Sequence, residues 1–218
     1  MPARLPALIH SNKGIPVQNR LNVLFAALAL AAPLALVIPA AAEAQSAAAK
    51  ILDQARGQAR EIEELRKILN GPDQNMRLAT FDAMIKSGDE TLKQIAYETG
   101  LMSADSVMRA MAFKAVLMSL DNLHLTLVPD STAPKPIQEK SAAHIAKNGN
   151  AYIVPMKQKD VEAGTFKHGS WQGQVSGLEF VFSYGGYNGS LTLDDDNGLS
   201  GLVRLGGNTQ FKASARLR

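Results

Sequence analysis

The stretch LEFVFSYGGYNGSLTLDDDNGLSGLVRL, residues 178–205, decides the fold of the C-terminal part of the chain. Large apolar side chains occupy every second position from Leu178 to Tyr184, which is the spacing of a strand with one buried face. Two further apolar runs, 190–193 and 199–205, flank the turn 194–198. The Asn-Gly pair of that turn tolerates positive φ angles, so the stretch predicts strands joined by a tight hairpin.

The neighbouring segments extend this β pattern in both directions. Residues 151–156 have the composition of a strand, and residues 170–175 alternate with Trp171 and Val175 on one face. Residues 210–217 can close the sheet. Five or more short strands with regular turns predict a small antiparallel β-sandwich or barrel over residues 151–218.

Residues 45–122 show instead the three- and four-residue spacing of helices. The first helix is predicted from Ser46 to about Asn70, with a single apolar stripe formed by Ile51, Ala55, Ala59, Ile62, Leu65 and Leu69. Three more are predicted over about 73–86, from Asp89 to near Gly100, and after Ser103 to about Leu120. A helical domain followed by a β domain makes the predicted fold class α+β.

Two of these helices resemble each other. DQNMRLATFDA, residues 73–83, aligns at an offset of 32 with DSVMRAMAFKA, residues 105–115, and five of the eleven positions are identical. The segment 71–120 resembles HEAT-type helical repeats, which often carry an acidic residue early in the first helix and an Arg four positions later. The resemblance implies stacked helical hairpins that bind a protein partner.

The alternative is a plain helical bundle without a recognition surface. In that interpretation the aromatic and sulfur-containing side chains form its core, namely Phe81, Phe113, Met84, Met108, Met111 and Met118. Arg77 and Arg109 are expected to pair with the acids four residues before them, Asp73 and Asp105.

Residues 123–150 are predicted to link the helical domain to the β domain. The segment 129–136 is rich in proline and other turn residues, and 123–128 has the pattern of a strand. A short helix is predicted over 137–147, because Asn148-Gly149 follows it as a stop signal.

The first 44 residues have the order of a secretory signal. A polar segment with three cations precedes the apolar run 21–42, which ends in Ala42-Glu43-Ala44. Small residues at the first and third positions of that triplet predict cleavage between Ala44 and Gln45, which places the mature protein in the periplasm or outside the cell. The alternative is an uncleaved anchor, because the apolar run is long enough to span a bilayer.

The composition excludes several classes of function. The chain has no cysteine, so it has no thiol nucleophile and no cysteine-ligated zinc. Its formal charge is +3, and no basic stripe is present, so nucleic acid is not an expected partner.

One turn offers candidate ligand-binding residues. Tyr184, Tyr187 and Asn188 surround a Gly-Gly pair, and together with Trp171 they supply aromatic faces and an amide for a saccharide. The alternative is a structural turn, because glycine-rich turns mostly serve the backbone.

A second turn offers oxygen ligands for calcium. The candidate ligands are Asp194, Asp195, Asp196 and Asn197. The turn does not match an EF-hand loop, because Leu193 falls where the first ligand is required. The alternative is a solvated turn. Calcium is the only cofactor that the sequence suggests.

Catalytic signals are sparse. His168 and Ser170 lie close together, with Asp160 and Glu162 upstream, which are the residue types of a Ser-His-acid triad. No Gly-x-Ser-x-Gly elbow occurs. We therefore predict a non-catalytic, exported protein-binding or scaffold protein of the bacterial envelope, whose partner is another envelope or secreted protein. A module that binds envelope saccharides and an uncharacterised hydrolase are the alternatives.

Overall fold

The computed structural model describes residues 40–217, with side chains described from Ser46 onward. The chain divides into two compact units, residues 1–47 and Ala48–Arg218. The described part of the first unit is the beginning of helix α1 (Ala40–Leu69). The export signal predicted over residues 1–44 lies mostly outside the described residues, and its cleavage site at Ala44 and Gln45 falls in α1. None of the described helices has the length and apolar character needed to cross a membrane.

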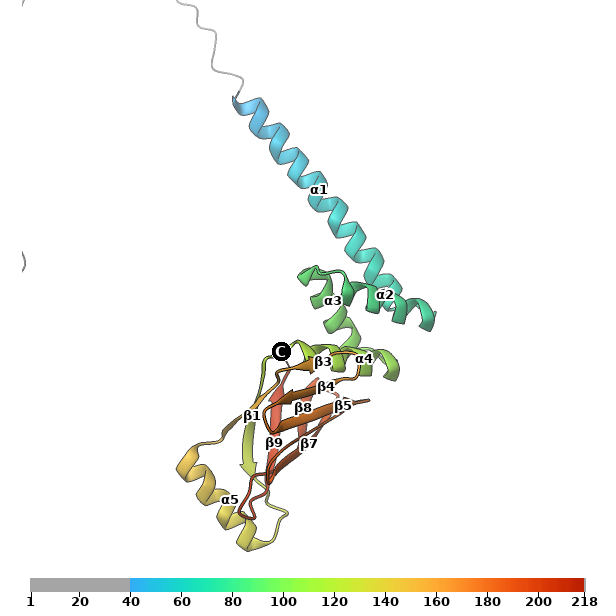
Figure 1. Ribbon diagram of the computed structural model, residues 1–218. Coiled ribbons are helices and arrows are strands. Elements are labelled where there is room, and N and C mark those ends of the chain that lie inside the picture. The colour runs from blue at the N-terminus through green and yellow to red at the C-terminus, as the bar shows by residue number, and fades with distance from the viewer. Residues whose placement is uncertain (1–39, 218) are drawn as a thin grey trace, which may run out of the picture. The chain divides into compact units, whose positions relative to one another are not determined.

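The second unit is α+β, as predicted. After α1 come α2 (Gln74–Lys86), α3 (Glu90–Leu101), α4 (Ser106–Ser119), β1 (Asn122–Pro129) and α5 (Lys135–Asn148). The remaining strands are β2 (Ala151–Pro155), β3 (Lys159–Asp160), β4 (Thr165–His168), β5 (Trp171–Ser176), β6 (Glu179–Tyr184), β7 (Tyr187–Leu193), β8 (Gly198–Arg204) and β9 (Phe211–Arg216). Figure 1 shows α4 beside the end of the sheet where β3 and β4 lie, and α5 at the opposite end.

The strands form one antiparallel, curled sheet in the order β2-β1-β9-β8-β7-β6-β5-β4-β3. Its two edge strands, β2 and β3, follow each other in the sequence. The residues between β2 and β3 are bonded to segments at both edges of the sheet. Met156 N donates to Asp121 O, just before β1, at 2.9 Å, and Lys167 N of β4 donates to Lys157 O at 3.1 Å. The continuous segment 151–160 therefore bridges the two edges of the curled sheet at the end nearest α4.

The segment interpreted as a linker, residues 123–150, contains a strand of this sheet. β1 pairs with β2 on one side and with β9 on the other. α5 is fixed to the end of β9 by Ser141, whose hydroxyl accepts from Gln210 N at 2.9 Å. Residues 123–150 thus supply an internal strand and a covering helix, because the strand pattern of 123–128 finds partners far away in the sequence.

Three aspartates begin the short helices. The side chains of Asp73, Asp89 and Asp105 accept hydrogen bonds from backbone N–H groups in the first turns of α2, α3 and α4. Asp105, and not Ser103, is therefore the cap of α4, while the Ser103 hydroxyl accepts from Asp105 N. α3 ends at Leu101, which agrees with the end predicted near Gly100. A Cβ on Gly100 would lie 2.6 Å from the Ala112 Cβ, so this glycine permits close packing of α3 on α4.

The two repeated arginines do not make the local pairs that the sequence predicts. Arg77 donates to the Asp105 carboxylate at 2.5 Å and to Gly71 O at 2.7 Å. Arg109 donates to Asp194 O at 2.5 Å and to the Asp195 carboxylate at 3.2 Å. Asp73 and Asp105 cap the helices that carry the two arginines, and each Arg instead reaches a carboxylate of a later segment, Asp105 or Asp195.

One contiguous core runs through the helices and the sheet. The predicted core of the helical part is confirmed, with five side chains buried and Met111 partly buried: Phe81, Phe113, Met84, Met108 and Met118. The inner face of the sheet is filled by phenylalanine and aliphatic side chains, among them Phe166, Phe180, Phe182 and Phe211. The curled sheet therefore encloses a packed core.

Candidate binding surfaces

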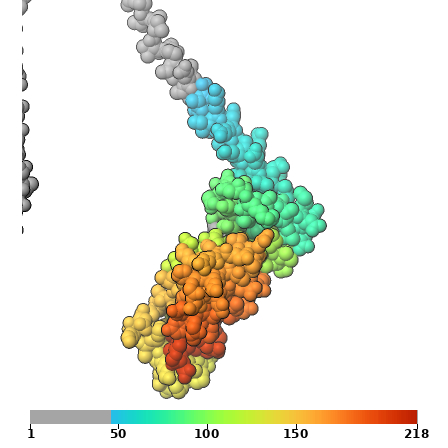
Figure 2. Space-filling model, viewed as in Figure 1, coloured from blue at the N-terminus to red at the C-terminus, as the bar shows by residue number. Residues whose placement is uncertain are grey.

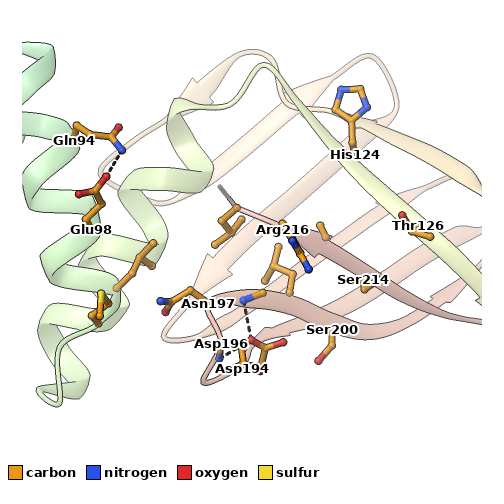
Figure 3. A pocket seen from close by; sticks show the side chains of 16 residues that line it. Gln94, Glu98, His124, Thr126, Asp194, Asp196, Asn197, Ser200, Ser214 and Arg216 are labelled. Atoms are coloured by element: carbon orange, nitrogen blue, oxygen red, sulfur yellow. Dashed lines mark hydrogen bonds between the residues drawn. The ribbon is translucent and has the colours of Figure 1, made fainter.

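A cleft of about 1080 Å³ lies between α3 and the outer face of the sheet. One wall is α3, from which Glu98, Leu101 and Met102 face the cleft. The rim is the β7–β8 hairpin, and the floor consists of β1, β8 and β9. Figure 3 shows Arg216 on the floor, the aspartates of the hairpin on one side of it, and Glu98 further away on α3.

The floor of the cleft carries a row of hydroxyl groups. Thr126 of β1 pairs with Ser214 of β9, and Ser214 pairs with Ser200 of β8. All three side chains are exposed and lie on the outer face, because they alternate with buried or partly buried residues along each strand. Sequence reasoning missed this surface, since its residues come from segments that lie far apart in the sequence.

The acidic hairpin predicted as a calcium turn forms the rim of the cleft. The Asp194 carboxylate accepts from Gly198 N at 2.7 Å and from Asp196 N at 3.1 Å, which holds the turn closed. Asp195 is bonded to Arg109, and Asn197 adopts a φ of 59°. Among the residues from 46 to 217, no three acidic or histidine side chains are arranged to hold a metal. Calcium binding by this turn stays a prediction.

Three of the predicted saccharide-binding residues meet at the opposite end of the sheet. Trp171 stacks on Tyr184 with ring centroids 4.8 Å apart and planes 11° apart, and Tyr184 contacts Tyr187 at 5.8 Å. Tyr184 and Tyr187 remain 39% and 37% exposed. Asn188 does not join them, because it lies on the outer face of β7 with the exposed residues of that strand. We call Tyr152, Trp171, Phe182, Tyr184 and Tyr187 the aromatic cluster.

Tyr152 is the member of the aromatic cluster that sequence reasoning missed. It lies on β2 and reaches Trp171 on β5 at 6.1 Å because the sheet curls. Burial, with smaller contributions from Tyr187 and Tyr184, raises the pKa of Tyr152 to about 12. Its hydroxyl is buried and has no hydrogen-bond partner among the described residues. Tyr152 therefore serves mainly as an apolar ring that packs between β2 and β5, which the curl of the sheet brings together.

The residues considered for a hydrolytic triad are not brought together. His168 and Ser170 are both exposed, and no hydrogen bond joins them within the described part of the chain. Asp160 is paired with Thr165, three residues before His168 along β4, and its carboxylate accepts from Ala163 N at 2.9 Å. Glu162 lies in the same turn. The acid is thus held away from the histidine by the register of β3 and β4.

The predicted apolar stripe of α1 is only partly buried. Leu69 is 1% exposed, and Ile62 and Leu65 pack against the core. Every residue from Ala48 to Glu61 is exposed, with Ile51 at 67% and Leu52 at 55%. Figure 2 shows no other segment of this unit covering this stretch of α1 on the visible face. Half of the stripe is therefore left uncovered.

No protein-family model matches the sequence, and neither a curated protein nor a solved structure matches it.

Proposed function

We propose that the protein is a non-catalytic, exported binding protein that captures a protein partner on the uncovered part of α1. The observation that carries this proposal is the exposure of Ile51 and Leu52 on a helix whose later turns are packed. Exposed apolar side chains grouped on one side of an element are typical of an interaction site.

Physical arguments on helix stability support this proposal. The stretch from Ala48 to Glu61 makes no packing contact with the core, and helices of this length are only marginally stable in water by themselves. A partner that covers the stripe would remove apolar surface from water and stabilise the helix at the same time. Recognition of an amphipathic helix by a groove is a common mode of protein binding.

The charges beside the stripe indicate the chemistry of the partner. Arg56 and Arg60 continue the line of Leu52 at four-residue spacing, and Ile51 and Ala55 form the neighbouring line. Arg56 makes one exposed ion pair, 3.4 Å from Asp53, which is weak at such a position. We expect the partner to present an apolar groove with an acidic rim.

A capture experiment tests the proposal. The full chain is immobilised, and an envelope extract is passed over it in three versions: unaltered, Ile51→Ser combined with Leu52→Ser, and Gln54→Ser as a control outside the stripe. We expect the unaltered chain and the control to retain a stoichiometric partner and the double variant to lose it. An empty capture by the unaltered chain, or equal capture by the double variant, contradicts the proposal.

Export is the second part of the proposal. Its basis is the apolar run 21–42 followed by the small residues Ala42 and Ala44. Intact-mass analysis of native material is expected to find a chain that begins at Gln45. Material that begins at Met1 and fractionates with cytoplasmic proteins would overturn it.

A second candidate function is saccharide binding by the aromatic cluster. The observation that favours it is that Trp171, Tyr184 and Tyr187 gather at one end of the sheet with two partly exposed rings. Sedimentation with peptidoglycan tests this function, and Tyr187→Ala is expected to abolish it. Sedimentation that persists in Tyr187→Ala would rule out the aromatic cluster as the site.

A further inference from the structure

We propose that the cleft between α3 and the outer face of the sheet binds a short peptide in its zwitterionic form. This surface is separate from the α1 stripe, so the inference does not depend on the proposed function. It rests on the arrangement of opposite charges across one cavity, with carboxylates on the α3 and hairpin sides and Arg216 on the floor (Figure 3).

The negative side of the cleft suits an ammonium group. Glu98 lies in the last turn of α3, where the carbonyl end of the helix adds partial negative charge. Gln94 donates to Oε1 of Glu98 at 2.6 Å, which holds the carboxylate in place and leaves its second oxygen for a ligand. Asp196 adds another carboxylate from the hairpin, and its side chain has no hydrogen-bond partner among residues 46–217.

The positive side suits a carboxylate. Arg216 is exposed at the end of β9 and makes no ion pair within the described residues. A guanidinium group binds a carboxylate through two parallel hydrogen bonds, which fixes the ligand's orientation as well as its charge. His124, on the outer face of β1, adds a further polar group at the same end of the floor.

The floor of the cleft offers hydrogen-bonding groups to a peptide beside Arg216. The hydroxyls of Thr126, Ser214 and Ser200 lie beyond Arg216 as seen from Glu98 (Figure 3), and each can donate and accept, as amide and carboxylate groups require. Leu101 and Leu199 offer apolar surface for a small side chain. The cleft, at about 1080 Å³, is large enough for a tripeptide.

Other ligand classes fit less well. A neutral saccharide would use the hydroxyl row but would leave the opposed charges without partners. A polyanion would be repelled by Glu98, Asp194 and Asp196, which outnumber the single arginine. A zwitterion satisfies both sides at once.

Three forms of one tripeptide test the inference by calorimetry on the full chain. The probes are trialanine, trialaninamide, which lacks the carboxylate, and N-acetyl-trialanine, which lacks the ammonium group. We expect trialanine to bind and each blocked form to bind about tenfold more weakly, as loss of a charge-assisted hydrogen bond implies.

Two variants assign the ends of the peptide. Arg216→Gln is expected to weaken trialanine about tenfold and to leave trialaninamide unchanged. Glu98→Gln is expected to weaken trialanine and to leave N-acetyl-trialanine unchanged. Both side chains are exposed, so both variants are expected to keep the circular dichroism spectrum and melting temperature of the unaltered chain.

Lys212→Gln is the matched control. Lys212 lies on the same face of β9 as Arg216 and carries the same charge, but it lies outside the cleft. We expect it to leave all three affinities unchanged. The inference is overturned if trialanine fails to bind at about 10 mM, if the blocked forms bind equally well, or if Lys212→Gln weakens binding as much as Arg216→Gln.

Discussion

At the residue scale, Asp105 joins two helices by serving both. Its carboxylate caps α4 through Val107 N and Met108 N, and it also accepts from Arg77. The hydrogen bond from Arg77 is the largest influence on the carboxyl and lowers its pKa from 3.8 to about 2, against the effect of burial. Ionised Asp105 therefore stabilises the folded chain.

The pH dependence of this contribution follows from the sign of the pKa shift. Because the folded-state pKa lies below the unfolded value, the stabilisation is complete above about pH 4 and is lost as the pH falls toward about 2. We expect Asp105→Asn to lower the Tm by roughly 3–6 °C at pH 7 and the gap to narrow strongly as the pH falls from about 4 to about 2. Thermal melting from pH 2 to pH 7 measures both effects.

Asp82→Asn is the control for Asp105→Asn. Asp82 pairs with Lys86 on the same helix at 2.8 Å, and the lysine is largely exposed. Such surface pairs contribute little, so its Tm is expected to stay within about 1 °C of the unaltered chain. A gap for Asp105→Asn that is the same at every pH would contradict the assignment.

Arg109 anchors the hairpin mainly through a backbone carbonyl. Its contact with Asp194 O is the shorter one, and its partner Asp195 has a fully exposed side chain. We expect Arg109→Ala to cost about 1–2 kcal/mol and Asp195→Ala less than about 0.5 kcal/mol. Urea unfolding measures both values, and hydrogen exchange at residues 194–198 is expected to accelerate only in Arg109→Ala. Equal destabilisation by both variants would show that the carboxylate is the main contact.

At the element scale, the inner face of the sheet depends on glycines that make room for aromatic rings. A Cβ on Gly189 of β7 would lie 2.4 Å from the ring of Phe182, which is buried. Gly189→Ala must displace that ring and is expected to cost about 1–3 kcal/mol in urea unfolding.

Gly186, three residues earlier, provides the matched control. A Cβ there would meet no atom within 4 Å. Gly186→Ala is expected to change the free energy of unfolding by less than about 0.5 kcal/mol. If the two substitutions were equally mild, the packing of Phe182 against Gly189 would not be a constraint on the fold.

How far the elements can be predicted from the sequence depends on how local their determinants are. The starts of α2 at Asp73 and of α3 at Asp89, and the hairpin at Asn197-Gly198, are encoded within a few residues. The structure has all three at these positions. β3 and β4 were missed, because two and four residues are too short to show a periodicity. The partners of β1 were missed because β9 is about eighty residues away.

The candidate sites follow the same rule. The stacking of Tyr184 on Trp171 can be predicted from the sequence, since both side chains lie on the inner face of neighbouring strands. The contribution of Tyr152 requires the curl of the whole sheet, which no local pattern encodes. The cleft is harder still to predict, because Glu98 and Arg216 line it from segments that are more than a hundred residues apart in the sequence.

At the scale of the whole molecule, the helical part and the sheet depend on each other. Lys159 Nζ donates to Leu120 O at 2.8 Å, and Lys114 Nζ donates to Glu162 O at 3.0 Å. Together with the bonds of Arg109, these bonds connect α4 and its C-terminal end to β3, to the turn between β3 and β4, and to the β7–β8 hairpin. The buried side chains of both parts also belong to one cluster, and Ala48–Arg218 form one compact unit.

Cooperative unfolding of the unit is the consequence. Separating the sheet from α4 would expose apolar side chains of both parts to water, so neither part is expected to persist when the other unfolds. Calorimetry of the full chain is expected to give one transition for residues 48–217, with equal calorimetric and van't Hoff enthalpies. Two transitions, or a fragment 122–218 that melts cooperatively by itself, would instead show independent domains. The cleft would then be a boundary between domains that move separately, because its α3 wall and its floor come from the two different parts.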